Sequence, residues 1–396
     1  MATALGSVVG VLLWLLALVG GWGAYQPAGG WLLWHAHLLV VGIALASVAG
    51  FLLTAVPEFT GCAALPSNAL RRMFAVWLLA RGAHLASGVW PAGLVLLMAL
   101  ADAWLSWRLL AFAAPPIWRA PHRRHVAFIP ALLTLSLVNL GAALSLWAED
   151  GRTLDWIHAS VHVLMTLIVV ALSRVSMRMV NDALEAQGHP DASYLARPPR
   201  RNLAVFCIAA YAAVSFAWPH ASTSGWLALA TAAAVFNLLN DWHVRTALTS
   251  RWVWPLYAVY AFMGAGYLML GCAQLWGLAG TNLGHHLLLV GALGMSQWMV
   301  MVIASSLHSG HRLPVGFWVP MGAALLVISA ITRASAAWPA WVGGAMHGWT
   351  LSALAWTVAW TLYLRYSWHT LWHVRPDGLQ GCEEGSAGSC DTRTHD

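Results

Sequence analysis

Long apolar runs recur from one end of the chain to the other, separated by short polar or proline-containing connections. Most runs contain about 18–25 residues, which is the length that a helix needs to cross about 30 Å of hydrocarbon. The pattern therefore predicts about twelve transmembrane helices. They span residues 4–22, 33–56, 72–88, 90–112, 126–147, 155–180, 201–218, 224–247, 253–276, 283–305, 314–333 and 341–367.

The composition agrees with this pattern. Of the 396 residues, 60% are hydrophobic and only 9% are charged, whereas about a quarter of the residues of a soluble domain are charged. The main solvent of the chain is therefore a lipid bilayer. We predict an all-α integral membrane protein with a single transmembrane domain over residues 1–378, followed by a disordered cytoplasmic tail rich in Gly, Ser and Glu over residues 379–396.

All 20 basic residues are arginines, and their positions predict the orientation of the helices. Only Arg81, Arg152 and Arg333 fall toward the side at which the odd-numbered helices end. Because basic residues are enriched in cytoplasmic loops, both termini are predicted to be cytoplasmic. The arginines are spread among many loops instead of forming one basic face, which argues against binding to nucleic acid.

Weak similarity between segments predicts an internal repeat. Residues 37–42 (HLLVVG) in helix 2 match residues 286–291 (HLLLVG) in helix 10, and a glycine follows each of the two histidines after 24 positions. Helix 6 has His158 or His162 at the corresponding place. Chance similarity between apolar helices is the alternative. We predict a pseudo-threefold arrangement of four-helix units that cover about residues 1–118, 119–250 and 251–378.

Histidines are numerous, and half of them gather at one predicted depth, near the periplasmic ends of their helices. Ionisable groups inside a membrane are costly and usually mark function, and neutral imidazole is the usual protein ligand of haem iron and copper. The alternative for such a histidine is a hydrogen bond at the membrane interface or one that orients a ligand. The residues are His35, His37, His84, His158, His162, His220, His285, His286 and His347.

The spacing of these histidines divides their roles. His158 and His162 lie four positions apart on one helix face, so they can hold one ion and form the predicted catalytic pair. His35 and His37 lie two positions apart and point to opposite sides of a helix, so they would serve two centres. The repeat pairs His37 with His286, and we predict that these two residues flank a bis-histidine haem.

Further residues complete the predicted site. His285, whose side chain diverges from that of His286 by about 100°, is an expected cofactor contact, and so is His84. Arg81 is the expected partner of a haem propionate. The haem should be b-type, because the chain has no C-x-x-C-H motif for covalent attachment. One or more haems are expected, with copper or non-haem iron as a second metal. The predicted metal ligands are His35, His37, His158, His162, His286 and His220.

Two aspartates also fall inside predicted helices. Asp102 in helix 4 and Asp241 in helix 8 occupy matching places toward the cytoplasm. We expect them to pair with Arg108 and Arg245 on the following turn. A proton relay is the alternative.

Three blocks of sequence carry a likeness to a known family. The first is Trp34-His35-Ala-His37-Leu, with GFLLTAVP at residues 50–57 and Thr60-Gly61. The second is HLLLVGALG at residues 286–294, with Met301 and LHSGHR at residues 307–312. The third is PLYAVY at residues 255–260, with Gly266-Tyr267. Over essentially the whole chain, these blocks resemble the NnrS family of bacterial membrane proteins.

The resemblance implies haem and copper content, a place in the bacterial cytoplasmic (inner) membrane and a role in resisting nitric oxide or nitrosative stress. The chain departs from the family pattern in helix 6, where residues 172–175 read LSRV in place of Gly-Gly-Arg-Val, and at Ile303, which replaces an arginine. The architecture also resembles, more distantly, the catalytic subunit of haem–copper oxidases and nitric oxide reductases. Helix 7, however, lacks a paired histidine.

Three functions compete at this point. The first is an enzyme that reduces nitric oxide, 2 NO to N2O, with electrons from quinol or a periplasmic electron carrier. The second is a non-catalytic haem or copper protein that senses or sequesters nitric oxide. The third is a twelve-helix transporter, which is disfavoured because the connection between helices 2 and 3 lacks the G-x-x-x-D-R pattern of the major facilitator class.

Overall fold

The computed structural model describes residues 1–121, 125–219, 221–278, 280–338, 344–376 and 378. Every regular element within these residues is a helix, and none is a strand. The predicted tail over residues 379–396 lies outside the described residues.

The elements of the first half are α1 (Ala2–Leu18), α2 (Gly30–His37), the π-helical segment η1 (Leu38–Ile43), α3 (Ala44–Thr60), α4 (Ser67–Ala86), α5 (Pro91–Arg119), α6 (Phe128–Ala148) and α7 (Thr153–Ala186). The second half begins with α8 (Pro198–Ala217), α9 (Ser222–Leu239) and the short 3-10 turns η2 (Asn240–Trp242) and η3 (Ala247–Thr249). It ends with α10 (Trp254–Trp276), α11 (Thr281–His286), the π-helical segment η4 (Leu287–Leu293), α12 (Gly294–Leu307), α13 (Trp318–Ser335) and α14 (Ala345–Trp372).

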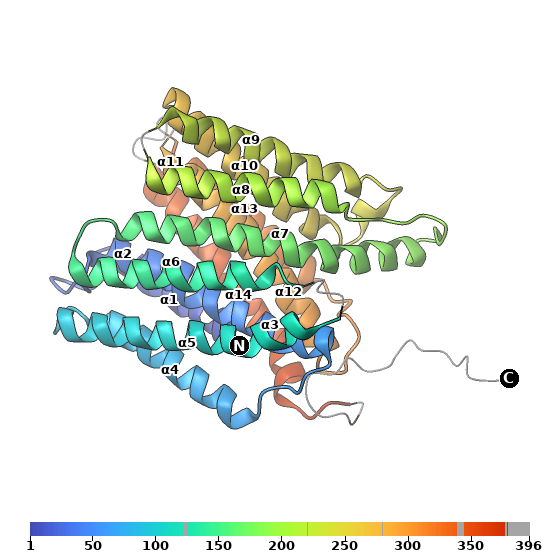
Figure 1. Ribbon diagram of the computed structural model, residues 1–396, viewed down its shortest axis with the longest axis horizontal. Coiled ribbons are helices and arrows are strands. Elements are labelled where there is room, and N and C mark those ends of the chain that lie inside the picture. The colour runs from blue at the N-terminus through green and yellow to red at the C-terminus, as the bar shows by residue number, and fades with distance from the viewer. Residues whose placement is uncertain (122–124, 220, 279, 339–343, 377, 379–396) are drawn as a thin grey trace.

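The long helices run roughly side by side in one bundle, with α4 and α5 at one edge and α9 at the other (Figure 1). Each of the twelve predicted runs corresponds to one helix or to one helix with a π-helical segment inside it. Among the described residues, eight of these spans are long and apolar enough to cross a membrane. The chain is therefore a multi-pass membrane protein. The remaining segments, α1, α4, α8 and α14, are shorter or less apolar, so twelve crossings and cytoplasmic termini stay predictions.

Residues at the helix ends explain several of the boundaries. Gly61 ends α3 and Gly277 ends α10, both in the left-handed conformation with φ of 68° and 61°. Glycine adopts this conformation without the steric penalty of a Cβ atom, and it commonly terminates helices. Proline opens α5 at Pro91 and α8 at Pro198, where the missing N–H would have no partner within the helix in any case.

A π-helical segment interrupts both helices of the matched pair. In predicted helix 2, the segment η1 lies between α2 and α3 and begins directly after His37. In predicted helix 10, the segment η4 lies between α11 and α12 and begins directly after His286. The glycines of the matched sequences, Gly42 and Gly291, lie inside these segments. A π turn is rare and is found mostly at functional sites. The likeness between the two helices therefore extends from sequence to backbone geometry.

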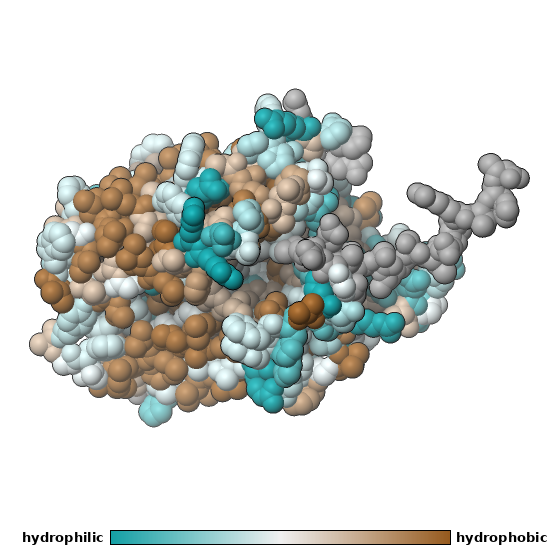
Figure 2. Space-filling model, turned by 90° about the horizontal axis from the view of Figure 1, so that it is seen from below, coloured by the Kyte–Doolittle hydropathy of each residue, from teal (hydrophilic) through white to brown (hydrophobic). Residues whose placement is uncertain are grey.

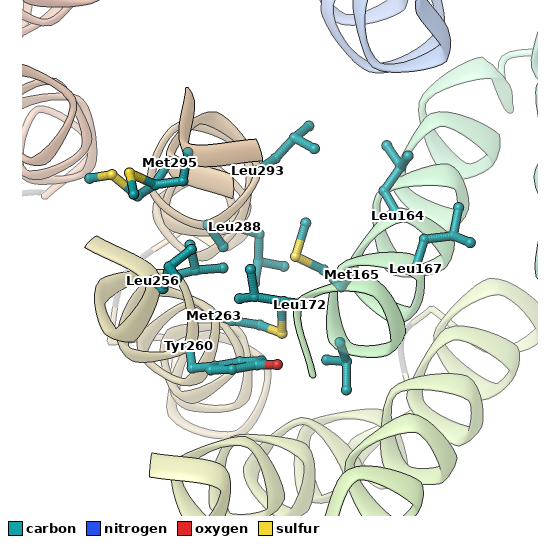
Figure 3. Packing of buried hydrophobic residues seen from close by; sticks show 14 of the residues in the cluster. Leu164, Met165, Leu167, Leu172, Leu256, Tyr260, Met263, Leu288, Leu293 and Met295 are labelled. Carbon is teal, nitrogen blue, oxygen red and sulfur yellow. The ribbon is translucent and has the colours of Figure 1, made fainter. Parts of the chain in front are cut away.

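Helix α7 and the span from Thr281 to Leu307 form the centre of the bundle. In the most apolar stretch of these spans, 67% and 72% of the residues are buried, against half or less in the other six. Figure 3 shows Met165 and Leu172 of α7 directed toward Leu288 of η4 and Met263 of α10. These apolar contacts fix the position of the histidines near the start of α7 relative to those of α11.

The outer surface agrees with a lipid environment. Apolar side chains cover much of the face seen in Figure 2, and most of the strongly hydrophilic side chains lie in the middle and on the right of the view. Exposed large apolar residues occur on many helices, for example Leu12, Leu100, Leu137 and Phe206. In water, an apolar surface of this extent would drive association; in a bilayer, it is the surface that contacts the acyl chains.

The contact between α12 and α13 generates the first prediction. A Cβ atom added at Gly322 would lie 2.1 Å from the ring of Trp298. This ring is fully buried and packs against Trp318 and Trp360, so it has little room to move. Gly322→Ala is therefore expected to lower the stability of the protein by about 1–3 kcal/mol, measured by thermal unfolding in detergent.

Gly50→Ala is the matched control for this substitution. The added Cβ at Gly50 meets no atom within 4 Å, and alanine is favoured over glycine inside a helix by roughly 0.5–1 kcal/mol. This variant should be at least as stable as the unmodified chain. Equal stability of the two variants would show that the α12–α13 contact is looser than described.

Candidate functional site

The predicted site residues lie at the end of the bundle at which α2, α7 and α11 begin, here called the histidine end (on the left in Figure 1). Their side chains separate into three groups. The first group is His37, Arg81, His84 and Asp102. The second group is His158, His162, Tyr211, Tyr267 and His285. The third group is His35, His286 and Arg333. His220 lies outside the described residues.

The first group joins helices α2, α4 and α5. The rings of His37 and His84 meet edge to face, with 4.8 Å between their centroids. His37 Nε2 lies 3.9 Å from Asp102 Oδ2, and Nη2 of Arg81 donates hydrogen bonds to both carboxylate oxygens of Asp102. All four residues are shielded from solvent: the side chain of Arg81 is 10% exposed, and those of His37 and Asp102 are 0% and 4% exposed.

Hydrogen bonding within the first group is incomplete. Both ring nitrogens of His37 and Nε2 of His84 are buried and have no hydrogen-bond partner, and Nε and Nη1 of Arg81 also lack one. Leaving such atoms unpaired in a low-dielectric interior is unfavourable. A neutral imidazole offers one lone pair, and a metal ion is one partner that can accept it.

The second group joins α7 to α11, with tyrosines from α8 and α10. The rings of His158 and His285 are stacked, with centroids 3.8 Å apart and an interplanar angle of 5°. The ring of His162 lies 6.2 Å from that of His285. These three imidazoles form one cluster, as the four-residue spacing of His158 and His162 predicts for α7. No room for an ion remains between the stacked rings, so ligation there requires one ring to rotate.

Two tyrosines hold the inner side of this cluster. Nδ1 of His162 lies 3.1 Å from the hydroxyl of Tyr267. Tyr211 meets the ring of His162 edge to face at 4.8 Å and that of Tyr267 at 5.6 Å, and Gln274 Nε2 donates a 3.2 Å hydrogen bond to the Tyr211 hydroxyl. Gln274 lies two residues before the end of α10. Gln274, Tyr211 and Tyr267 therefore place polar groups beside the cluster, and the hydroxyl of Tyr267 is hydrogen-bonded to His162.

The third group joins α2, α11 and the last turn of α13. The ring of His35 stacks on Trp14 with 4.5 Å between centroids, and its Nδ1 is buried without a hydrogen-bond partner. Nδ1 of His286 donates to the carbonyl oxygen of Asn282 at 2.8 Å. Because a carbonyl oxygen only accepts, Nδ1 carries the proton and Nε2 keeps its lone pair. This tautomer is the one that ligates a metal through Nε2.

His35 and His37 belong to different groups, in agreement with their spacing. The predicted pairing of His37 with His286, however, does not match the structure. His37 packs against His84 in the first group, and His35 is the helix 2 histidine close enough to His286 to interact with it electrostatically. Arg333 lies within the same range of both His35 and His286.

The predicted pairing of the two aspartates is wrong. Asp102 binds Arg81 of α4 and not Arg108 of its own helix. Asp241 lies 2.6 Å from Nη1 of Arg200, at the start of α8, and not beside Arg245. Both carboxylates pair with the helix that precedes their own. Arg81 is therefore already neutralised by a carboxylate, which weakens its assignment as a propionate partner.

Within the described part of the chain, no group of three or more His, Cys, Asp or Glu side chains is arranged to hold a metal ion. Haem iron needs only one or two protein ligands, because the porphyrin supplies four nitrogen atoms. The donor set at the histidine end, neutral imidazoles with free nitrogen atoms, thus fits haem. A copper or non-haem iron site held by protein ligands alone has no such group among the described residues.

Two cavities of the structure lie away from these histidines. One, of about 310 Å³, is lined by Met179, Asp182 and Arg251 near the far end of α7. The other, of about 160 Å³, is apolar and is lined by Leu45, Trp77 and neighbouring residues of the first helices. Neither is lined by a histidine.

Three residues of these groups were not assigned a role from the sequence. Arg333 carries a recognisable signal, since it is one of three arginines on the side opposite to all the others. Tyr267 belongs to the third block of family likeness, but nothing in its spacing indicates a contact with His162. Tyr211 offers no signal, because its place beside His162 depends on how α8 packs against α7.

A family model described as NnrS protein matches residues 1–375 of the chain. The search of curated proteins found no match to the chain.

The Arg81–Asp102 pair generates a prediction about stability. Asp102→Asn removes the carboxylate and leaves the guanidinium of Arg81 in an apolar interior without its counter-charge. We expect a loss of about 3–5 kcal/mol, measured by thermal unfolding in detergent. Asp155→Asn is the control, because Asp155 is 41% exposed and pairs with Arg152 at 3.4 Å; this change should cost about 0–1 kcal/mol.

Replacing both partners separates charge from packing. Arg81→Leu combined with Asp102→Leu removes the pair without leaving one charge behind, so this double variant should be more stable than Asp102→Asn alone. A single variant that is as stable as the unmodified chain would contradict the described ion pair.

Proposed function

Because the chain belongs to the NnrS family, we propose that it is a haem b protein of the nitric oxide response and that it reduces nitric oxide to nitrous oxide. The reaction would take place at the histidine end, and nitric oxide would reach it through the bilayer. The overall reaction, 2 NO + 2 e⁻ + 2 H⁺ → N2O + H2O, requires two electrons and two protons. Quinol or a periplasmic electron carrier is the proposed electron donor.

The tautomer of His286 is the observation that carries the proposal. Its Nδ1–H is fixed on the carbonyl of Asn282, so the lone pair of Nε2 is available. His35, whose Nδ1 has no hydrogen-bond partner, lies in electrostatic range. We propose that His35 and His286 hold the haem. One-electron transfer and the binding of a diatomic gas are the chemistry that an iron porphyrin supplies when bound.

The second group is proposed to act on the substrate. His158 and His285 present their rings toward each other beside the third group, and they are the proposed ligands of a second centre. His162 is placed to handle protons, because its Nδ1 is hydrogen-bonded to the Tyr267 hydroxyl. A hydroxyl group can both donate and accept, so a proton can pass between Tyr267 Oη and His162 Nδ1.

The surrounding helices favour this reaction over one with a polar substrate. Nitric oxide is small and uncharged, so it can dissolve in the bilayer and reach the site between apolar helices. Protons cannot take that route, since a charge in hydrocarbon is costly. The hydroxyl of Tyr267, 3.1 Å from Nδ1 of His162, is the proposed last donor of these protons.

Absorption and electron paramagnetic resonance spectra of single variants test the haem assignment. His35→Ala and His286→Ala should each remove the same low-spin haem signal, because loss of an axial nitrogen weakens the ligand field and often releases the haem. His308→Ala should retain it, since His308 lies about 22 residues further along helix 10, roughly 33 Å at 1.5 Å per residue, beside Glu58. The pyridine haemochrome should be that of haem b.

The same spectra can contradict the assignment. Full low-spin haem in both His35→Ala and His286→Ala, with loss in His308→Ala, would place the redox site at the opposite end of the bundle. A purified protein that contains no haem would favour a transporter. Haem that binds nitric oxide without forming N2O would favour a protein that senses or sequesters the gas.

Tyr267→Phe tests the role of the inner hydroxyl. Without it, His162 has no group from which to take a proton, so N2O formation should slow by about 10- to 100-fold while the haem spectrum stays unchanged. Tyr260→Phe is the control, because Tyr260 is a buried tyrosine on the same helix that packs against Trp242; it should keep full activity. Equal rates in both variants would refute a proton-transfer role for Tyr267.

A further inference from the structure

Three arginines lie toward the histidine end, and two of them have acidic partners. Arg81 is bound to Asp102 inside the bundle. Arg152 lies near Asp155 at the surface, where its side chain is 50% exposed. In the part of the chain that the structure describes, no acidic side chain forms an ion pair with Arg333.

Arg333 lies in the last turn of α13, a helix that packs against α11 and η4. Its guanidinium is 5.7 Å from the ring centroid of Trp349. Nη1 is buried and has no hydrogen-bond partner. Arg333 is close enough to His35 and His286, the proposed haem ligands, to interact with both electrostatically. A permanent cation with a free donor group thus lies at the same end of the bundle as the third group of histidines.

The side chain of Arg333 is half-buried, and an anion would supply the partner that its buried Nη1 lacks. A buried charge is tolerated when it is paired and hydrogen-bonded, and a neutral imidazole provides no negative charge. The other acids of this end are engaged or exposed. Asp102 is held by Arg81, and Asp155 by Arg152. Hydrogen bonds from the Ser145 hydroxyl and the Arg152 backbone N–H keep the pKa of Asp150 below its usual value, and Glu149 is exposed.

We propose that Arg333 binds a carboxylate that comes from outside the chain, namely a propionate of the haem held by His35 and His286. The guanidinium is planar and carries parallel donors that match the two oxygens of a carboxylate. This assignment rests on the proposed function, and it transfers to Arg333 the role first expected of Arg81. Arg81 is unsuited to it, because its guanidinium already binds Asp102.

The phosphate of an anionic lipid shares the chemistry that Arg333 would recognise. Its source, however, is the bilayer and not the cofactor. The experiment therefore compares two forms of haem that differ only at the carboxylates, and it measures the anionic phospholipid that co-purifies with the chain.

The test uses the purified full-length chain, freed of haem and reconstituted in detergent with haem or with haem dimethyl ester, in which both propionates are neutral. The unmodified chain should bind haem at least about tenfold more tightly than the ester, in keeping with a charge-assisted hydrogen bond. Arg333→Gln should bind both forms with similar affinity. Arg152→Gln is the matched control and should keep the full preference for haem.

Each other outcome overturns the assignment in a recognisable way. A preference for haem that persists in Arg333→Gln would place the propionate elsewhere while leaving haem binding intact. Equal binding of both forms by the unmodified chain, together with anionic phospholipid that co-purifies and is lost in Arg333→Gln, would assign the arginine to a lipid phosphate. Absence of binding by the unmodified chain to either form would refute the proposed function as well.

A charge-conserving variant covers the case in which Arg333→Gln does not fold. Arg333→Lys keeps the cation but loses the planar pair of donors, so it should retain part of the preference for haem over its ester. Helical content by circular dichroism and a single peak in size-exclusion chromatography establish that a variant is folded. A folded Arg333→Lys protein with an unchanged preference would contradict two-point recognition of the carboxylate.

Discussion

A polar atom buried between helices in a bilayer has no water to bind, and this constraint organises the whole histidine end. Several buried polar side chains among the described residues meet it with a partner from another element, as Ser329 does with Ser352 and Asp102 with Arg81. Buried nitrogen atoms without a partner also occur elsewhere, for example on Trp242 and Gln297, but those of His35, His37, His84 and Arg333 lie at the histidine end. Since unpaired polar atoms are costly, these four residues support the proposal that this end binds a ligand.

The same constraint explains why the helices could be predicted from the sequence. In lipid, the backbone must satisfy its own hydrogen bonds, so an apolar run of sufficient length can only be a helix. All twelve predicted runs are helical for that reason. The π-helical segments after His37 and His286 could not be predicted, because a π turn leaves no periodicity in apolar residues. Only the shared motif of the two segments hinted at a common local geometry.

The candidate site was predictable within a helix and not between helices. Helical spacing correctly separated His35 from His37 and joined His158 to His162 in one cluster. It also shows why Asp102 cannot meet Arg108, since six positions turn the helix by about 240° and place the two side chains on different faces. Arg245 fails for another reason: α9 ends at Leu239, and Arg245 has a positive φ of 50° outside any helix.

Which helices become neighbours decides the remaining partners, and charge offers one way to read this from a sequence. Nearly all arginines of the chain lie toward one side, where lipid headgroups and water can solvate them. The three exceptions lie toward the other side. Asp102 pairs with Arg81 inside the bundle, and Asp155 pairs with Arg152 at the surface. Arg333 remains, beside neutral imidazoles and without an acid. The arginine asymmetry that predicts the orientation of the helices therefore also singles out Arg333, the cation for which we propose a partner from outside the chain.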